Sequence, residues 1–157
     1  MLTQEEINNT NWSQSVAGVC IQDGKVLLAR HTYGNGAGKL IIPGGYLKFG
    51  ELPEETLIRE YQEETGVTVK PGNLLGIRFN EKDWYAVFSV DYVDGEARSD
   101  GDENSEVVWM DTQEALRDET VPDLTKVMIK CALNTKGIGI TPYQTTKARN
   151  ELYSGLR

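Results

Sequence analysis

The sequence predicts an α+β fold, an α/β/α sandwich in which a mixed, mainly antiparallel sheet lies between helices. Strand-like and helix-like segments are mixed without the regular strand–helix–strand alternation of a doubly wound fold. Asp23-Gly24 joins two largely apolar runs, Ser15–Gln22 and Lys25–Arg30, and this pattern predicts a β-hairpin. Two segments with helical patterns, Pro53–Thr65 and Asp123–Leu133, would cover the two faces of the sheet.

Length, charge and the N-terminal sequence restrict the class of protein. With 157 residues the chain is expected to form one main domain. The net charge of −8 argues against a nucleic-acid polymer as partner, because such binders carry basic surfaces. It does not exclude a small anionic substrate. The sequence has neither a signal-peptide pattern nor an apolar run long enough to span a membrane, so we expect a cytoplasmic protein without membrane association.

The remaining elements follow from short apolar runs and turn residues. Further strands are expected at Leu40–Ile42, Val67–Lys70, Leu74–Phe79, Trp84–Tyr92 and Val107–Met110, with a turn at Pro71–Asn73 and a short helix at Thr112–Arg117. The glycine-rich segment His31–Leu40 is either a flexible surface loop or a rim of the active site.

The C-terminal segment is expected to be an extension of the main domain. Residues 1–134 would form that domain, and residues 135–157 would either dock on it or join two copies into a homodimer. A helix is predicted within the extension, at Thr145–Tyr153. The apolar residues of the extension favour burial in either arrangement.

The segment Pro53–Thr65 combines helix signals with an acidic face. Pro53 suits the first helical turn, and Gly66 suits the position after the last turn. On a helix, Glu60, Glu63 and Glu64 fall within an arc of about 100°. Because such like charges repel one another, a bound cation would stabilise the arrangement, and carboxylate oxygens suit Mg²⁺ or Mn²⁺.

The spacing around this helix resembles the signature of a known family. The identity positions are Gly45, Glu51, Arg59, Glu60, Glu63, Glu64 and Gly66. Their order resembles the Nudix box, G-x5-E-x7-R-E-U-x-E-E-x-G-U, in which U is aliphatic. The resemblance implies a Nudix-like fold and metal-dependent hydrolysis of a diphosphate bond in a nucleoside diphosphate linked to another moiety. Nucleoside triphosphates, dinucleoside polyphosphates and nucleotide sugars are all candidate substrates. A non-catalytic domain that senses ADP-ribose or another nucleotide is the alternative.

The same resemblance assigns roles to individual residues. It implies that Glu60, Glu63 and Glu64 hold Mg²⁺ or Mn²⁺, assisted by the carbonyl of Gly44. It further implies that Glu51 and Arg59 pair and fix the helix. Two carboxylates are candidates for the general base: Glu63, and Glu106 from the segment SEVVW.

Substrate contacts are expected from residues both within and outside the box. Arg30, Lys48 and Tyr85 are the candidates, although Tyr85 also fits a role in core packing. Three positions depart from the usual pattern: Tyr61 replaces an aliphatic residue, Thr56 an alanine and Lys48 a glutamate. Lys48 would place a positive charge beside the metal, where it either contacts a phosphate or reduces the number of metal ions held.

Overall fold

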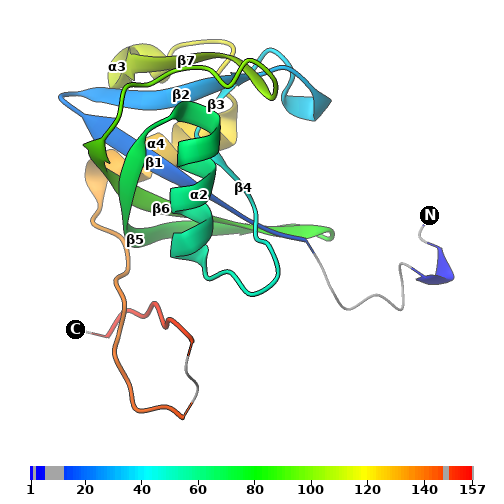
Figure 1. Ribbon diagram of the computed structural model, residues 1–157, viewed down its shortest axis with the longest axis vertical. Coiled ribbons are helices and arrows are strands. Elements are labelled where there is room, and N and C mark those ends of the chain that lie inside the picture. The colour runs from blue at the N-terminus through cyan, green and yellow to red at the C-terminus, as the bar shows by residue number, and fades with distance from the viewer. Residues whose placement is uncertain (2, 6–12, 147–148, 157) are drawn as a thin grey trace.

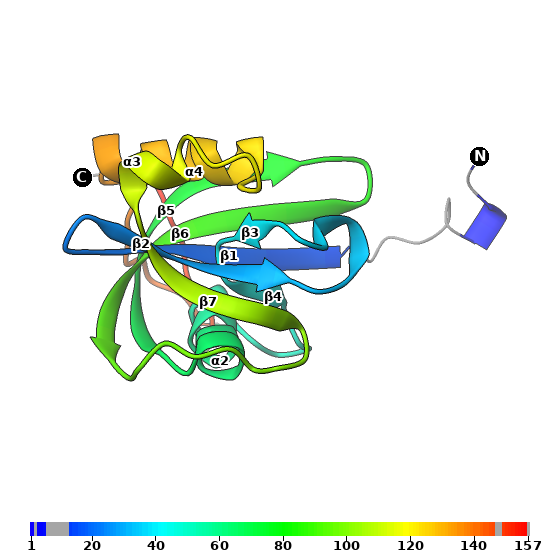
Figure 2. The same ribbon diagram turned by 90° about the horizontal axis from the view of Figure 1, so that it is seen from above.

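The computed structural model describes residues 1, 3–5, 13–146 and 149–156. Among them, seven strands form one sheet between helix α2 (Pro53–Thr65) and helix α4 (Asp123–Asn134) (Figures 1 and 2). This arrangement confirms the α+β sandwich predicted from the sequence. No helix in the described part of the chain is long and apolar enough to cross a membrane.

The sheet is mixed and mainly antiparallel. Its main path runs in the order β3-β2-β1-β6-β5, while β4 pairs with β1 and β7 pairs with β2. Only β1 and β6 run parallel among these pairs. The strands are β1 (Ser13–Gln22), β2 (Lys25–His31), β3 (Leu40–Ile41), β4 (Gly44–Tyr46), β5 (Thr68–Phe79), β6 (Asp83–Asp94) and β7 (Asn104–Asp111).

Strands β1 and β2 separate soon after the turn that joins them. They pair only at Ile21 with Val26 and at Gln22 with Lys25, beside the Asp23-Gly24 turn. Farther along, β1 pairs with β6 and β4, whereas β2 pairs with β7 and β3. The sheet therefore opens between β1 and β2.

Each helix packs on its own apolar cluster. On the α2 side, the fully buried Leu57 and Tyr61 pack with strand residues such as Phe88. On the α4 side, Met128 and Ile129 pack against the opposite face of the sheet. Burying one such side chain contributes roughly 1.5–3 kcal/mol, so the two clusters hold the helices firmly against the sheet.

Three details differ from the sequence prediction. The expected turn at Pro71–Asn73 is a bulged part of the single strand β5, which lies at the edge of the sheet, where proline is tolerated. Strand β7 begins earlier than expected, at Asn104. The predicted helix at Thr145–Tyr153 is wrong for its described residues: they are not helical, and Tyr153 forms a bridge with Ile140. The short helix is confirmed as α3 (Thr112–Ala115), capped by Asp111.

Candidate active site

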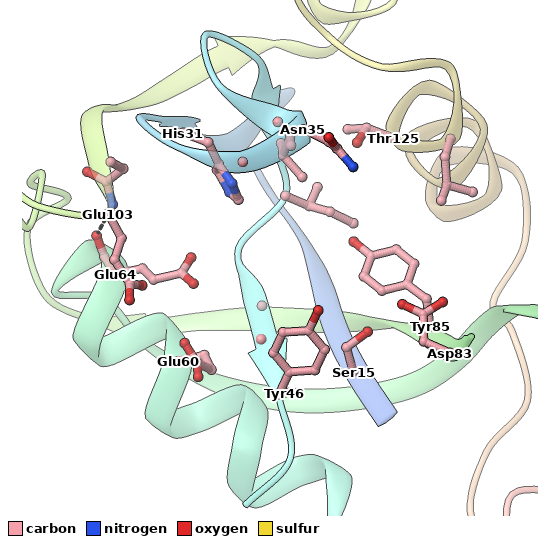
Figure 3. A pocket seen from close by; sticks show the side chains of 18 of the residues that line it. Ser15, His31, Asn35, Tyr46, Glu60, Glu64, Asp83, Tyr85, Glu103 and Thr125 are labelled. Carbon is pink, nitrogen blue, oxygen red and sulfur yellow. Dashed lines mark hydrogen bonds between the residues drawn. The ribbon is translucent and has the colours of Figure 1, made fainter. Parts of the chain in front are cut away.

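A cleft of about 760 Å³ occupies the region where β1 and β2 separate. It extends from the acidic face of α2 to the N-terminal end of α4 (Figure 3). The glycine-rich loop forms part of the rim of this cleft through residues 33–36. Within it, Gly34–Gly36 form a 3-10 turn. The site residues are thus supplied by α2, by the loops beside it and by the strands that diverge.

Local sequence signals place helix α2 at the cleft. Pro53 is its first residue, and the Glu55 carboxylate accepts a hydrogen bond from the Leu52 N–H at 2.9 Å. Gly66 ends the helix with φ of 74°, a left-handed conformation that glycine adopts without strain. The predicted bounds of this helix are confirmed at both ends.

Arg59 links the loop before α2 to the acidic face of the helix. Its guanidinium donates to both carboxylate oxygens of Glu51, from Nε at 2.8 Å and from Nη2 at 2.9 Å. The other terminal nitrogen, Nη1, donates to Glu60 at 2.7 Å and to Glu63 at 3.3 Å. The expected Glu51–Arg59 pair is therefore present, and it is bidentate. Hydrogen bonding to Arg59 lowers the pKa of Glu51 to about 2.

Glu64 is a buried carboxylate with an oxygen that no hydrogen bond satisfies. Its residue exposure is 7%, and its Oε2 has no hydrogen-bond partner among the described residues. Burial, followed by the charge of nearby Glu60, raises the pKa of Glu64 to about 9. Leaving a buried polar atom unpaired costs roughly 1–3 kcal/mol, so this oxygen is suited to a ligand.

Strand β4 passes unusually close to these carboxylates. A Cβ atom on Gly45 would lie 2.5 Å from the carboxyl carbon of Glu60, so any side chain here would displace the Glu60 carboxylate. At Gly44 a Cβ would lie 2.1 Å from the backbone oxygen of Val16, because Gly44 pairs with Ala17 of β1. The two glycines thus bring backbone against α2.

The donor chemistry of this site fits a hard divalent cation. Glu60 and Glu64 supply carboxylate oxygens, one of them unsatisfied, and the backbone at Gly44 lines the same wall. Among the described residues, no three acidic, histidine or cysteine side chains are arranged as a ready metal site. Arg59 holds Glu60 and Glu63, and Glu63 is exposed outside the lining of the cleft.

The acidic loop, residues 99–106, contributes a different residue to the cleft from the one expected. Glu106 lies opposite Arg30 in the β2–β7 pair, and the two side chains form an exposed ion pair at 3.2 Å. Neither residue lines the cleft, in contrast to the roles predicted for them. Glu103 does line it, and Figure 3 shows its side chain near Glu64. Burial and then the charge of Glu60 raise the pKa of Glu103.

Asn104 anchors this loop to helix α2. The side chain is only 2% exposed, and its Nδ2 donates to the backbone oxygen of Glu64 at 2.8 Å. Its Oδ1 accepts a hydrogen bond from the Ser99 hydroxyl at 2.6 Å. Sequence reasoning missed both Glu103 and Asn104. The acidic run 99–106 was the available signal, but it could not show which members face inward.

Of the predicted substrate residues, Lys48 and Tyr85 line the cleft and Arg30 does not. Tyr85 lies at the end remote from Glu60, where the guanidinium of Arg78 is 5.6 Å from the centre of its ring. Arg78 in turn pairs with Asp83 at 2.5 Å. This end of the cleft offers an aromatic face and an ion pair of zero net charge.

Two departures from the usual box have structural explanations. The Tyr61 hydroxyl donates to the backbone oxygen of Gly18 at 2.5 Å, so the ring spans from the helix to strand β1. The Thr56 hydroxyl donates to Glu51 at 3.0 Å and adds to the contacts that hold this carboxylate. Both side chains therefore help to attach α2 to its surroundings.

Comparison with known proteins agrees with this geometry. The NUDIX-domain family model matches residues 12–131. The chain belongs to the NUDIX family. NUDIX hydrolases generally use divalent metal ions, which is consistent with the oxygen-rich wall formed by Glu60 and Glu64.

The chain spans only part of the length of the curated NUDIX relatives that it matches. The chain is 33% identical over 103 residues to an ADP-ribose pyrophosphatase from Methanocaldococcus jannaschii, covering 62% of this chain and 60% of that protein. It is 31% identical over 112 residues to an NAD-capped RNA hydrolase, NudC, from Vibrio atlanticus, covering 67% of this chain and 37% of that protein. A solved NUDIX hydrolase from Nitrosomonas europaea superimposes with a TM-score of 0.72 at 26% identity, covering 81% of this chain and 92% of that one.

Proposed function

We propose that the protein hydrolyses a diphosphate bond in a nucleoside diphosphate linked to another moiety, with Mg²⁺ or Mn²⁺ as cofactor. The observation that carries this proposal is the unsatisfied, buried oxygen of Glu64 beside Glu60, at one end of a cleft in a NUDIX domain. The other end of the cleft has room and aromatic surface for a nucleoside. The proposed substrate is a small nucleotide, since the net charge of −8 disfavours a nucleic-acid polymer.

Glu60 and Glu64 would hold the divalent ion, with the backbone of Gly44 and the carboxylate of Glu63 as further oxygen donors nearby. When bound, such an ion neutralises diphosphate charge and lowers the pKa of a coordinated water. Arg59 orients Glu60 through its hydrogen bond at 2.7 Å and is itself fixed by Glu51. Glu51 and Arg59 thus position the site and take no part in the bond breaking.

Chain residues would also handle the proton and the substrate. We assign the general base to Glu103, because it lines the cleft and because burial raises its pKa. Glu63 is the alternative base, although it is exposed and paired with Arg59. Lys48 would contact a phosphate oxygen, and Tyr85 the nucleoside.

The proposal is tested by product analysis on a nucleotide panel with Mg²⁺ or Mn²⁺. The panel includes ADP-ribose, a dinucleoside polyphosphate, a nucleotide sugar and nucleoside triphosphates. We expect Glu103→Gln to lower kcat by about 10²–10⁴-fold, as loss of a general base does. Glu106→Gln is the matched control, and it is expected to retain wild-type kcat. Equal effects of the two substitutions would contradict the assignment of the base.

The same panel separates the enzyme from a nucleotide sensor. Saturable nucleotide binding without any product, unchanged by Glu60→Gln, would favour the sensor over the hydrolase. The intact box residues favour the hydrolase.

Cytoplasmic location and a homodimer stay predictions. Fractionation of the source cells would test the location, and light scattering of the purified chain would test the dimer.

A further inference from the structure

The segment after α4 folds back along the edge of the sheet. The backbone groups of Ile138 and Leu74 exchange two hydrogen bonds of 2.8 Å, which attach the segment to strand β5. It then turns back on itself, with Thr141 N–H donating to the oxygen of Leu152 at 2.7 Å. Figure 1 shows this segment below the N-terminal end of α2.

Near its end, the segment contacts the domain beneath helix α2. The Tyr153 ring packs edge-on against Phe88, with ring centres 5.2 Å apart, and Phe88 belongs to the apolar cluster under α2. Arg149 donates to the backbone oxygen of Gly50 at 3.1 Å and forms an ion pair with Glu55. The segment therefore contacts both the helix core and the loop that precedes the helix.

Arg149 joins two parts of the structure that position Glu51. Gly50 is next to Glu51 in the loop, and Glu55 lies in the first turn of α2, where the oxygen that pairs with Arg149 also accepts from the Leu52 N–H. The loop itself is exposed at Phe49 and turns through Gly50 with φ of 85°. Contacts from outside the loop therefore matter for its geometry.

On its inner side, the loop is held by Arg59. Arg59 donates to the backbone oxygen of Tyr46 at 3.2 Å as well as to both oxygens of Glu51. Arg149 holds the outer side through Gly50. A continuous series of polar contacts thus connects Arg149, through the loop and Glu51, to Arg59 and then to Glu60.

We propose that the C-terminal segment is part of the scaffold of the active site, with Arg149 as a positioning residue. By fixing the loop at Gly50, Arg149 sets the Glu51–Arg59 pair and hence the orientation of Glu60 toward a divalent ion. The inference rests on the proposed function for the identity of the ligand. It goes beyond that function by giving a role to a segment outside the matched NUDIX region.

This role can be tested without depending on turnover by measuring Mn²⁺ binding to the full-length protein. Electron paramagnetic resonance detects the free ion and gives the Kd. We expect Arg149→Ala to raise the Kd for Mn²⁺ by about tenfold, the lower end of the effect of removing groups that orient metal ligands. Arg149→Lys should restore part of the affinity. Arg117→Ala removes the same charge from an exposed site and is the matched control.

A second variant and a stability measurement distinguish a positioning role of Arg149 from a general loss of folding. Glu55→Gln weakens the same ion pair from the opposite side and should raise the Kd in the same direction, while the Tm without metal shows whether the variants are folded. Folded Arg149→Ala and Glu55→Gln proteins with the Kd of Arg117→Ala would overturn the proposal. Wild-type protein that binds Mn²⁺ but hydrolyses no nucleotide would contradict the proposed function and leave the positioning role supported by a raised Kd.

Discussion

Glu51 and Glu64 have the same side chain, yet their surroundings move their pKa values in opposite directions. Arg59 and backbone donation from Lys48 lower the pKa of Glu51 to about 2, so this carboxylate is always charged near neutral pH. Burial and Glu60 raise the pKa of Glu64 to about 9. Glu51 is therefore suited to pair with an arginine, and Glu64 is suited to bind a cation.

A third carboxylate, that of Glu151, should make the stability of the protein depend on pH. Burial, followed by hydrogen bonding with Glu54, raises the pKa of Glu151 from 4.5 to about 7. Because the folded pKa exceeds the unfolded one, the contribution of Glu151 to stability is fully present below about pH 4.5 and is lost as pH rises through 7. We expect the Tm of wild type to fall relative to Glu151→Gln between pH 5 and about pH 8.

Exposed Glu119 provides the control for this experiment. Glu119→Gln should leave the dependence of Tm on pH parallel to that of wild type. A Tm difference between wild type and Glu151→Gln that is constant across the pH range would show that Glu151 does not change its protonation state in this window.

At the scale of elements, the site depends on how closely β4 approaches α2. Leu57 and Tyr61 bury one face of the helix, and Tyr61 also reaches the backbone of β1. The acidic face beside them is thereby held against Gly45, where a side chain would displace Glu60. Packing of the apolar face thus sets the positions of the carboxylates on the neighbouring face.

Gly45→Ala tests this approach. The new methyl group would displace the flexible end of Glu60 rather than backbone, so we expect a folded protein with a Tm close to wild type. Displacement of Glu60 should raise the Kd for Mn²⁺ by at least about tenfold, measured by the resonance of free Mn²⁺. Gly155→Ala, whose added methyl meets no neighbouring atom, is the control. Unchanged Mn²⁺ affinity in Gly45→Ala would contradict the placement of Glu60 in the metal site.

At the scale of the whole molecule, the site lies where the sheet opens between β1 and β2. One end of the cleft is formed by α2 and the acidic loop, and the other by α4 and the β5–β6 hairpin. Elements that pack on separate apolar clusters therefore meet at a single cleft. Binding of metal and nucleotide across this opening should stabilise the molecule as a whole.

Thermal unfolding of Glu64→Gln tests that coupling. Without metal, the uncharged amide avoids both the burial of a charge and the repulsion from Glu60, so we expect a Tm at or above that of wild type. Mn²⁺ at 100 times its Kd should add about 2.7 kcal/mol to the unfolding free energy of wild type. The variant should lose this increase. A Mn²⁺-dependent rise in Tm that is equal in both proteins would exclude Glu64 as a ligand.

Features with local causes were predictable from the sequence. The bounds of α2 follow from Pro53 and Gly66, and the hairpin from Asp23-Gly24, since these residues act on their own stretch of backbone. The prediction for the C-terminal extension failed at Thr145–Tyr153, because its described backbone groups bond to distant residues instead of forming a helix.

The sequence by itself determined helix α2, the Glu51–Arg59 pair and the family to which the box belongs, because these depend on fixed spacing along one chain segment. Only the tertiary structure decided which acid of the loop faces the cleft. Pairing of β7 with β2 sets Glu106 opposite Arg30, and it leaves Glu103 beside Glu64. Glu103 lies just before β7, where the pairing with β2 shifts register between Arg30 and His31. Its position therefore depends on contacts between segments far apart in sequence, which spacing along the chain does not encode.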